Sequence, residues 1–212
     1  MASIAIIDYG MGNLRSVAKA LEQVAPQTRV FVTQQRHDIL HADRVVFPGQ
    51  GSIRDCMHEL TRWDLVEVVR DAARNKPFLG LCLGPQALLD FSEENGGVAG
   101  LQVLPGRVLW FGELRDPVSG ERLKVPHMGW NQVHQWHSHP LWTGIAQDSR
   151  FYFVHSYYLQ PADETLVAGR TRYGFDFASA IARDNIFAVQ FHPEKSAQAG
   201  LRLLANFAEW QP

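Results

Sequence analysis

The first half of the chain alternates short apolar runs with stretches in which apolar residues recur at helical spacing. Residues 4–7 form an apolar run that precedes the turn residues 10–13, and an amphipathic stretch follows at once. Such patterns predict strands and helices, respectively. The expected strands cover 4–7, 29–32, 44–47 and 78–81. The expected helix faces are Leu14, Val17, Ala18, Leu21 and Val24; Trp63, Val66, Val69 and Ala73; and Leu83, Ala87, Leu88 and Phe91.

After Gly96 and Gly97, valines, aromatic residues and turn signals dominate the sequence. This texture predicts antiparallel strands and hairpins, with an exposed tip at 116–120 and a closing helix over 196–207. The expected strands are 103–111, 125–133, 150–154, 165–168, 177–182 and 186–191. We therefore expect an α/β fold in one domain over residues 1–212. It should have an open, mostly parallel sheet, helices on both faces, and antiparallel strands in the second half.

Composition and charge exclude several classes of function. The formal net charge is −2, so no global basic field attracts nucleic acid or anionic lipid. No apolar run approaches the roughly 20 residues needed to span a bilayer. The N-terminus runs as a strand into an acidic residue and lacks the basic segment of a signal peptide. With only two cysteines, Cys56 and Cys82, we expect a cytoplasmic protein with free thiols.

The sharpest local motif is Gly-Leu-Cys-Leu-Gly at 80–84, between an expected buried strand and a helix. It has the form of a nucleophile elbow with cysteine at the centre, where glycines relieve the crowding of a tight turn. The helix that follows presents its positive end to Cys82 and favours the thiolate, and the Leu83 N–H is free to bind an oxyanion. On this motif alone, a buried structural cysteine is an equally good interpretation. Cys56, which lacks flanking glycines, is expected to fill the core.

A cysteine nucleophile needs a base, and the base needs a group that orients it. The segment His192-Pro193-Glu194 follows the apolar run 186–189 and supplies both. Proline disfavours helical geometry at His192, so we expect an extended segment in which Glu194 lies on the same side as the His192 ring. The carboxylate would then bond one ring nitrogen and leave the other to face Cys82. A polar histidine that ends a strand is the alternative interpretation.

Two further features concern ligands. Gly49, Gln50 and Gly51 lie where a strand gives way to a helix, so their backbone N–H groups can approach a ligand closely and supply a second oxyanion donor. The lysine of a phosphate loop is absent there. His134, His137 and His139 lack the spacing and companion ligands of a metal site. We expect neither a metal nor a cofactor.

Three ordered segments give the chain a resemblance to a known family: PGQGS at 48–52, GLCLGPQ at 80–86 and FHPEKS at 191–196. Together they resemble the class I glutamine amidotransferases over essentially the whole chain. The resemblance implies Cys82 as the nucleophile that forms a γ-glutamyl thioester, His192 as the proton shuttle and Glu194 as its orienter. It also implies oxyanion donors in the 49–51 loop and at Leu83, and Gln86 as a contact for the substrate, glutamine.

Residues 6–21, 125–133 and 151–158 further resemble the glutaminase subunits of imidazole glycerol phosphate synthases. That resemblance implies delivery of ammonia to a separate (β/α)₈-barrel cyclase, which makes imidazole glycerol phosphate and aminoimidazole carboxamide ribotide in histidine biosynthesis. The chain would be one partner of a heterodimer. The implied partner-facing residues are Asn13, Pro126, His127, Met128, Gly129, Trp130 and Lys195.

The sequence departs from the family pattern at two positions and leaves alternatives open. The family usually has Met in place of Pro85 and a small apolar residue in place of Gln50; neither change removes a catalytic side chain. A glutaminase of another pathway, a cysteine peptidase on a similar elbow, and an inactive partner-binding module are the rival interpretations. The PHMGWN segment at 126–131 argues against the first rival, and the intact set of Cys82, His192 and Glu194 argues against the third.

Overall fold

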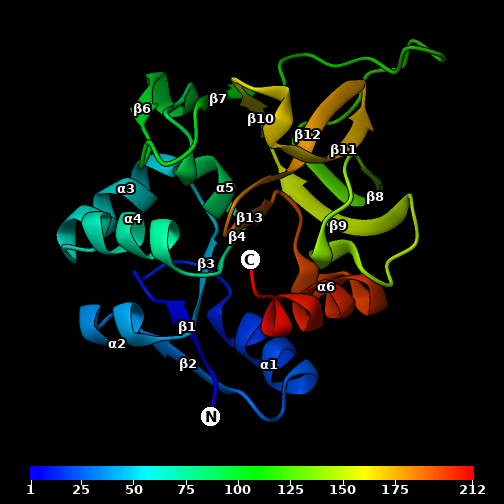
Figure 1. Ribbon diagram of the computed structural model, residues 1–212. Helices are drawn as coiled ribbons and strands as arrows, with labels where there is room; N and C mark the ends of the chain where they lie inside the picture. Colours follow the sequence, from blue (N-terminus) through cyan, green and yellow to red (C-terminus); the bar gives the residue numbers. More distant parts are fainter.

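A computed structural model describes residues 1–212 and places a mostly parallel sheet at the centre of the molecule (Figure 1). Its five central strands follow the order β2-β1-β3-β4-β13, and all of them pair in parallel. This order confirms the parallel sheet expected from the apolar runs. The strands are β2 (Arg29–Thr33), β1 (Ser3–Ile7), β3 (Arg44–Gly49), β4 (Phe78–Cys82) and β13 (Ile186–Val189).

Antiparallel strands extend this sheet beyond β13, as the sequence of the second half predicts (Figure 1). Three strands, β12, β11 and β8, lead outward to β9, and β10 and β7 form a second branch. This branch continues into β5 and β6, and the pairing of β5 with β7 is parallel. The strands are β5 (Phe91–Ser92), β6 (Val98–Ala99), β7 (Gly106–Trp110), β8 (His127–Gln135), β9 (Ser149–His155), β10 (Tyr157–Pro161), β11 (Val167–Tyr173) and β12 (Phe175–Arg183).

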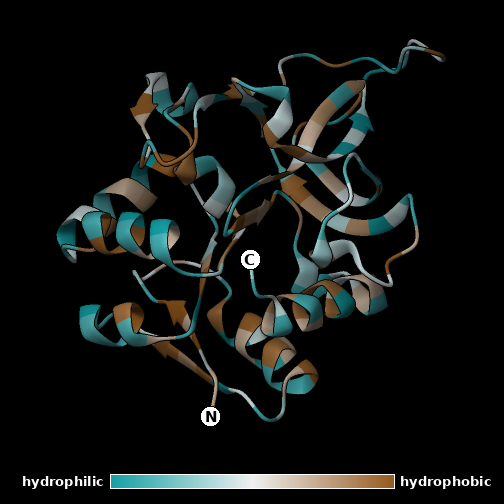
Figure 2. Ribbon diagram, in the orientation of Figure 1, coloured by the Kyte–Doolittle hydropathy of each residue, from teal (hydrophilic) through white to brown (hydrophobic).

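Helices cover both faces of the parallel strands, because alternate strand residues are apolar on both sides. Ile4 and Ile6 pack with α1 and α6 on one face, whereas Ile7 and Phe47 pack with α3, α4 and α5 on the other. Figure 2 shows apolar residues along the ribbon on both sides of the sheet. The helices are α1 (Leu14–Val24), α2 (Arg36–His41), α3 (Ile53–Arg62), α4 (Val66–Asn75), α5 (Leu83–Leu88) and α6 (Ala197–Glu209), and none is long and apolar enough to cross a bilayer.

Some expected boundaries are wrong. Trp63 does not share a helix face with Val66, because Asp64 adopts a positive φ of 54° between α3 and α4 and leaves Trp63 41% exposed. Phe91 is not helical, because α5 ends at Leu88 and the next residue is extended. The short helix α2 was not expected, since it buries only Ile39.

Arg44 ties the first half of the sheet to the end of the last helix. Its side chain is buried, and the guanidinium donates from Nε to the Phe207 carbonyl at 3.1 Å and from Nη2 to the Trp210 carbonyl at 2.9 Å. The Phe207 carbonyl also accepts from the Trp210 N–H at 3.2 Å, so Arg44 gives it a second bond. The Trp210 carbonyl lies beyond the last turn of α6, and Arg44 supplies the partner that a buried carbonyl needs.

We expect Arg44→Met to lower the free energy of unfolding by about 2–3 kcal/mol, because hydrogen bonds from a charged donor contribute about that much and the carbonyls stay buried. Urea denaturation measures the change. Arg62→Ala is the control: its ion pair with Glu59 is exposed, so the change should stay within about 0.5 kcal/mol. Equal losses for the two variants would contradict the structural role of Arg44.

Candidate active site

Cys82 lies at the junction of β4 and α5 with a strained backbone. Its φ is 55° and its ψ is −89°, in a region that residues with a side chain rarely occupy. Such a conformation costs on the order of 1–3 kcal/mol and persists only when the surroundings enforce it. The elbow expected from the sequence is therefore present, with Pro85 at the third position of the helix, where no intrahelical N–H is needed.

The glycines on either side of Cys82 are required by close packing. A Cβ at Gly84 would lie 2.5 Å from the Phe47 carbonyl oxygen, and one at Gly80 would lie 2.9 Å from the Cβ of Ala188. Both neighbours belong to strands that flank β4. The elbow therefore fits against the sheet only when these positions carry no side chain.

Gln190 follows directly after the adjacent strand β13 and holds the elbow. Its fully buried side chain donates from Nε2 to the Cys82 carbonyl at 3.0 Å, and its Oε1 accepts from Gln86 Nε2 at 2.9 Å. Sequence reasoning missed Gln190. The available signal was a single amide side chain between the apolar run 186–189 and the His-Pro-Glu segment.

His192 and Glu194 make the side-chain contact expected of a base and the group that orients it. His192 Nδ1 lies 2.9 Å from Glu194 Oε1, and both side chains are at least 95% buried. The backbone differs from the expectation in part: His192 is extended, but residues 193–195 form a 3₁₀ turn, η4 (Pro193–Lys195), closed by a bond from Lys195 N–H to the His192 carbonyl. The fixed φ of proline suits the start of such a turn, so the contact arises from a turn and not from an extended segment.

The remaining ring nitrogen of His192 makes no hydrogen bond of ordinary geometry with another protein atom. Burial lowers the pKa of His192, but interactions with the Cys82 and Glu194 side chains raise it more, to about 10. The imidazolium form is therefore favoured while it lies beside Cys82 and Glu194. This is the charge state that pairs with a thiolate nucleophile.

Cys82 and His192 line the same cavity, which has a volume of about 690 Å³. Of the residues predicted to bind oxyanion or substrate, Gln50, Gly51, Leu83 and Gln86 also line it. Gly49 lies just behind, at the end of β3, and Tyr9 donates its hydroxyl to the adjacent Pro48 carbonyl at 3.0 Å. The structure thus brings three sequence segments, far apart along the chain, around one hollow.

The cavity has a second wall that sequence reasoning missed. It consists of Val154, His155, Ser156 and Tyr157, at the bend between β9 and β10. Glu94, in the 3₁₀ turn η1 (Glu94–Gly96), also lines the cavity and accepts from the Ile53 N–H at 2.8 Å. Burial raises the pKa of Glu94, with a further contribution from Asp55 that the Ile53 N–H and Arg54 oppose.

The expected partner-facing residues divide into two groups. Lys195 and Pro126 are exposed and also line the cavity, and Asn13 and Gly129 are partly exposed. Met128 and Trp130 are 61% and 49% exposed. His127, in contrast, is only 3% exposed, so its expected place at a partner surface is wrong. Successive residues of a strand point to opposite faces, and on β8 His127 falls on the inner face.

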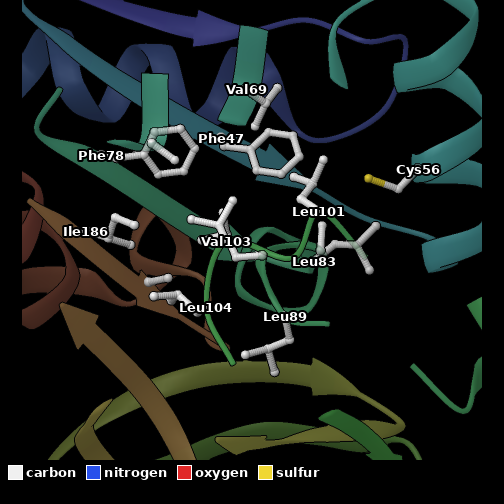
Figure 3. Packing of buried hydrophobic residues seen from close by; sticks show 14 of the residues in the cluster. Phe47, Cys56, Val69, Phe78, Leu83, Leu89, Leu101, Val103, Leu104 and Ile186 are labelled. Atoms are coloured by element: carbon white, nitrogen blue, oxygen red, sulfur yellow. The ribbon is translucent and has the colours of Figure 1, made fainter. Parts of the chain in front are cut away.

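Cys56 and the histidine cluster lie apart from this cavity. Cys56 is 1% exposed among the core side chains of α3 and β3 (Figure 3), and burial raises its pKa to about 12. His134 contacts Asp148 at 2.9 Å, and His139 packs against Phe187 and Trp210. No group of three or more His, Cys, Asp or Glu side chains is arranged to hold a metal ion.

A strained cysteine elbow, a buried histidine–carboxylate pair and a shared cavity on an open α/β sheet are the features of a triad hydrolase. The family model for glutamine amidotransferase class-I matches residues 5–210, so the chain belongs to this family of enzymes.

Two relatives and one solved structure are similar to this chain over nearly its whole length. The imidazole glycerol phosphate synthase subunit HisH of Nitrosococcus oceani is 64% identical over 210 residues, covering 99% of this chain and 98% of its own. The protein of the same name from Nitrosospira multiformis is 61% identical over 214 residues and covers all of both chains. The solved structure of PurLQS from Thermotoga maritima shares the fold, with a TM-score of 0.70, 16% identity and 98% coverage of each chain.

We expect Glu194→Gln to lower the pKa of His192, because the neutral amide no longer stabilises the imidazolium. In the wild type the raised pKa of about 10 contributes stability that is present below the unfolded value of 6.5 and lost as pH rises through 10. In the variant this loss of stability should occur at lower pH. A ¹⁵N NMR titration of the imidazole ring measures the pKa of His192, and the exposed Glu209→Gln is the control. An unchanged His192 titration would contradict the pairing.

Proposed function

We propose that the chain is the glutaminase subunit of an imidazole glycerol phosphate synthase. It hydrolyses glutamine to glutamate and ammonia, and the ammonia passes to a separate (β/α)₈-barrel cyclase in histidine biosynthesis. The observation that carries the proposal is the convergence of Cys82 and His192 at one cavity, with Cys82 held at a strained elbow and His192 bonded to the buried Glu194 carboxylate. The names of the full-length relatives support the pathway. A single catalytic domain over 1–212, a cytoplasmic location and the absence of a cofactor belong to the proposal.

In the first half of the reaction the thiolate of Cys82 attacks the side-chain amide carbon of glutamine. His192 takes the thiol proton through Nε2, the ring nitrogen not bonded to Glu194, and delivers it to the departing ammonia. The products of this half are ammonia and a γ-glutamyl thioester on Cys82. In the second half His192 activates a water molecule, which hydrolyses the thioester to glutamate and restores the thiol.

Backbone N–H groups stabilise the oxyanion that forms in each half. Leu83 is the first residue of α5, so its N–H has no partner within the helix. The 49–51 loop lies beside it, because Gly49 pairs with Cys82 across β3 and β4. A donor at each place would hold the oxygen from two sides, and one such donor is worth about 10²–10³ in kcat.

Glu94 and Gln86 suit the polar end of the substrate. Free glutamine carries an ammonium group, and the Glu94 carboxylate at the cavity wall would pair with it. Gln86 is held by Gln190, so its amide is fixed before substrate enters. A carboxylate at this wall favours a free amino acid over an internal peptide residue, which has no ammonium, and this argues against the peptidase alternative.

The surface around Met128, Trp130, Lys195 and Asn13, here called the docking surface, would receive the cyclase. Met128 and Trp130 expose large apolar groups, of the kind enriched in the cores of protein interfaces. Lys195 belongs to both the docking surface and the cavity. Ammonia released at Cys82 would thus leave close to the partner.

We expect Cys82→Ala to abolish glutamine-dependent synthesis, because no other group in the cavity replaces the thiolate. The complex should still use ammonium salts, which bypass the glutaminase. Glutamate release and cyclase product formation measure the two activities. Cys56→Ala is the control, since that thiol lies in the core and its loss should leave glutamate release intact. Glutamate release by Cys82→Ala at the wild-type rate, or cleavage of peptides by the wild type without ammonia release, would refute the proposal.

We expect Lys195→Ala to reduce the stimulation of glutaminase by the cyclase with little change in thermal stability, because the exposed side chain belongs to both the docking surface and the cavity lining. Lys76→Ala, at the opposite end of the parallel strands, is the matched control. Glutamate release is measured with and without the cyclase and its nucleotide substrate. Identical stimulation in the two variants would exclude this role for Lys195.

A further inference from the structure

Two buried histidines lie side by side between the docking surface and the cavity. His127 of β8 and His155 of β9 are direct cross-strand partners, and His127 Nδ1 lies 2.9 Å from His155 Nε2. They are 3% and 6% exposed. The triad chemistry uses neither ring, so their burial needs another explanation.

The hydrogen bonds of this pair permit only one arrangement of protons on neutral rings. The Tyr157 carbonyl can only accept, so His155 Nδ1 carries a proton and donates to it at 2.7 Å. His155 Nε2 then accepts from His127 Nδ1, and His127 Nε2 accepts from Asn131 Nδ2 at 3.2 Å. Burial lowers the pKa of both rings, to about 4 for His127 and about 3 for His155, so both are neutral near pH 7.

Aromatic neighbours hold the His127 ring in place. It stacks on Tyr173 with ring centroids 4.1 Å apart and on Phe153 at 4.8 Å. Asn131 also donates to the Arg172 carbonyl at 2.9 Å, which ties this part of β8 to β11. The ring therefore cannot turn without breaking contacts on three strands.

The chain of hydrogen bonds runs from Asn131 on β8 to the Tyr157 carbonyl. At the β8 end, Met128 and Trp130 alternate with these residues along the strand and point outward, on the face opposite to His127. At the other end His155 closes the bend at Ser156, because its ring bonds the carbonyl two residues ahead. That bend is the wall of the cavity formed by residues 154–157.

We propose that His127 is a positioning residue that fixes the cavity wall at 154–157 to the docking strand, so that docking of the cyclase sets how tightly glutamine is bound. This inference rests on the proposed function and names a route by which the partner acts on the same site. His127 touches neither the triad nor the docked partner; it acts through His155. The affected quantity is therefore the coupling between docking and glutamine binding.

The experiment compares two variants of His127 in the full chain, each with and without a barrel cyclase. His127→Phe keeps an aromatic ring between Tyr173 and Phe153 but has no N–H for His155. His127→Asn loses the ring but keeps an amide N–H near the position of Nδ1. The measured quantity is kcat/KM for glutamine with the cyclase divided by the same value without it.

We expect His127→Phe to reduce this ratio at least about fivefold, the lower end of ordinary coupling between sites, mainly through KM with the cyclase bound. Activity without the cyclase should change little. His127→Asn should retain more of the coupling than His127→Phe despite its poorer packing. A role in packing alone predicts the reverse order of the two variants, and that order would overturn the proposal.

Trp142→Phe is the matched control, because it removes another buried bond, from Nε1 to the Ala168 carbonyl, without contact with the cavity wall. It should keep wild-type coupling even where its thermal midpoint falls as far as that of His127→Phe. Equal coupling in His127→Phe and the wild type would refute the positioning role while leaving the glutaminase function intact. Absence of glutamate release by the wild type with its cyclase would instead refute the proposed function.

Discussion

The conformation of one residue, Cys82, is the constraint on which the site depends. A positive φ at a cysteine is unfavourable by itself, so the turn exists only because the neighbouring groups leave no alternative. Gln190 donates a hydrogen bond to the Cys82 carbonyl. Gly80 and Gly84 have no side chains, so the strands on either side of β4 can pack closely against the turn. The same turn places the thiol at the cavity and starts α5 beneath it. The strained backbone of Cys82, the position of the α5 N-terminus and the free N–H of Leu83 are thus all consequences of this one turn.

The two core clusters explain why this geometry is maintained. One packs α3, α4 and α5 on the sheet, as Figure 3 shows around Phe47 and Leu83, and the other packs α1 and α6 on the opposite face. Because both faces are covered, β4 and β13 cannot shift separately. His192 follows the end of β13, so its distance from Cys82 is set by sheet register. Catalytic groups built on adjacent parallel strands are preorganised by the core.

The two faces of strand β8 carry different groups. Its outward residues Met128 and Trp130 are exposed apolar groups, whereas His127 on the inner face is buried in hydrogen bonds. The period of two along a strand places these two environments on one short segment, as the proposed docking and positioning roles require. For the same reason His127 is buried although its neighbours in the 126–131 segment are exposed.

The sequence by itself determined the parallel sheet, the elbow at Cys82 and the histidine–glutamate pair, because each depends on local patterns: apolar runs, glycine spacing and a short turn. It did not determine the boundary at Asp64, the burial of His127, the clamp by Gln190 or the place of Glu94 in the cavity. Those depend on which distant segments meet, as when Gln190 reaches a carbonyl 108 positions earlier in the chain. Hydrophobic periodicity specifies which face of an element is buried, but only the packed structure specifies what lies against it.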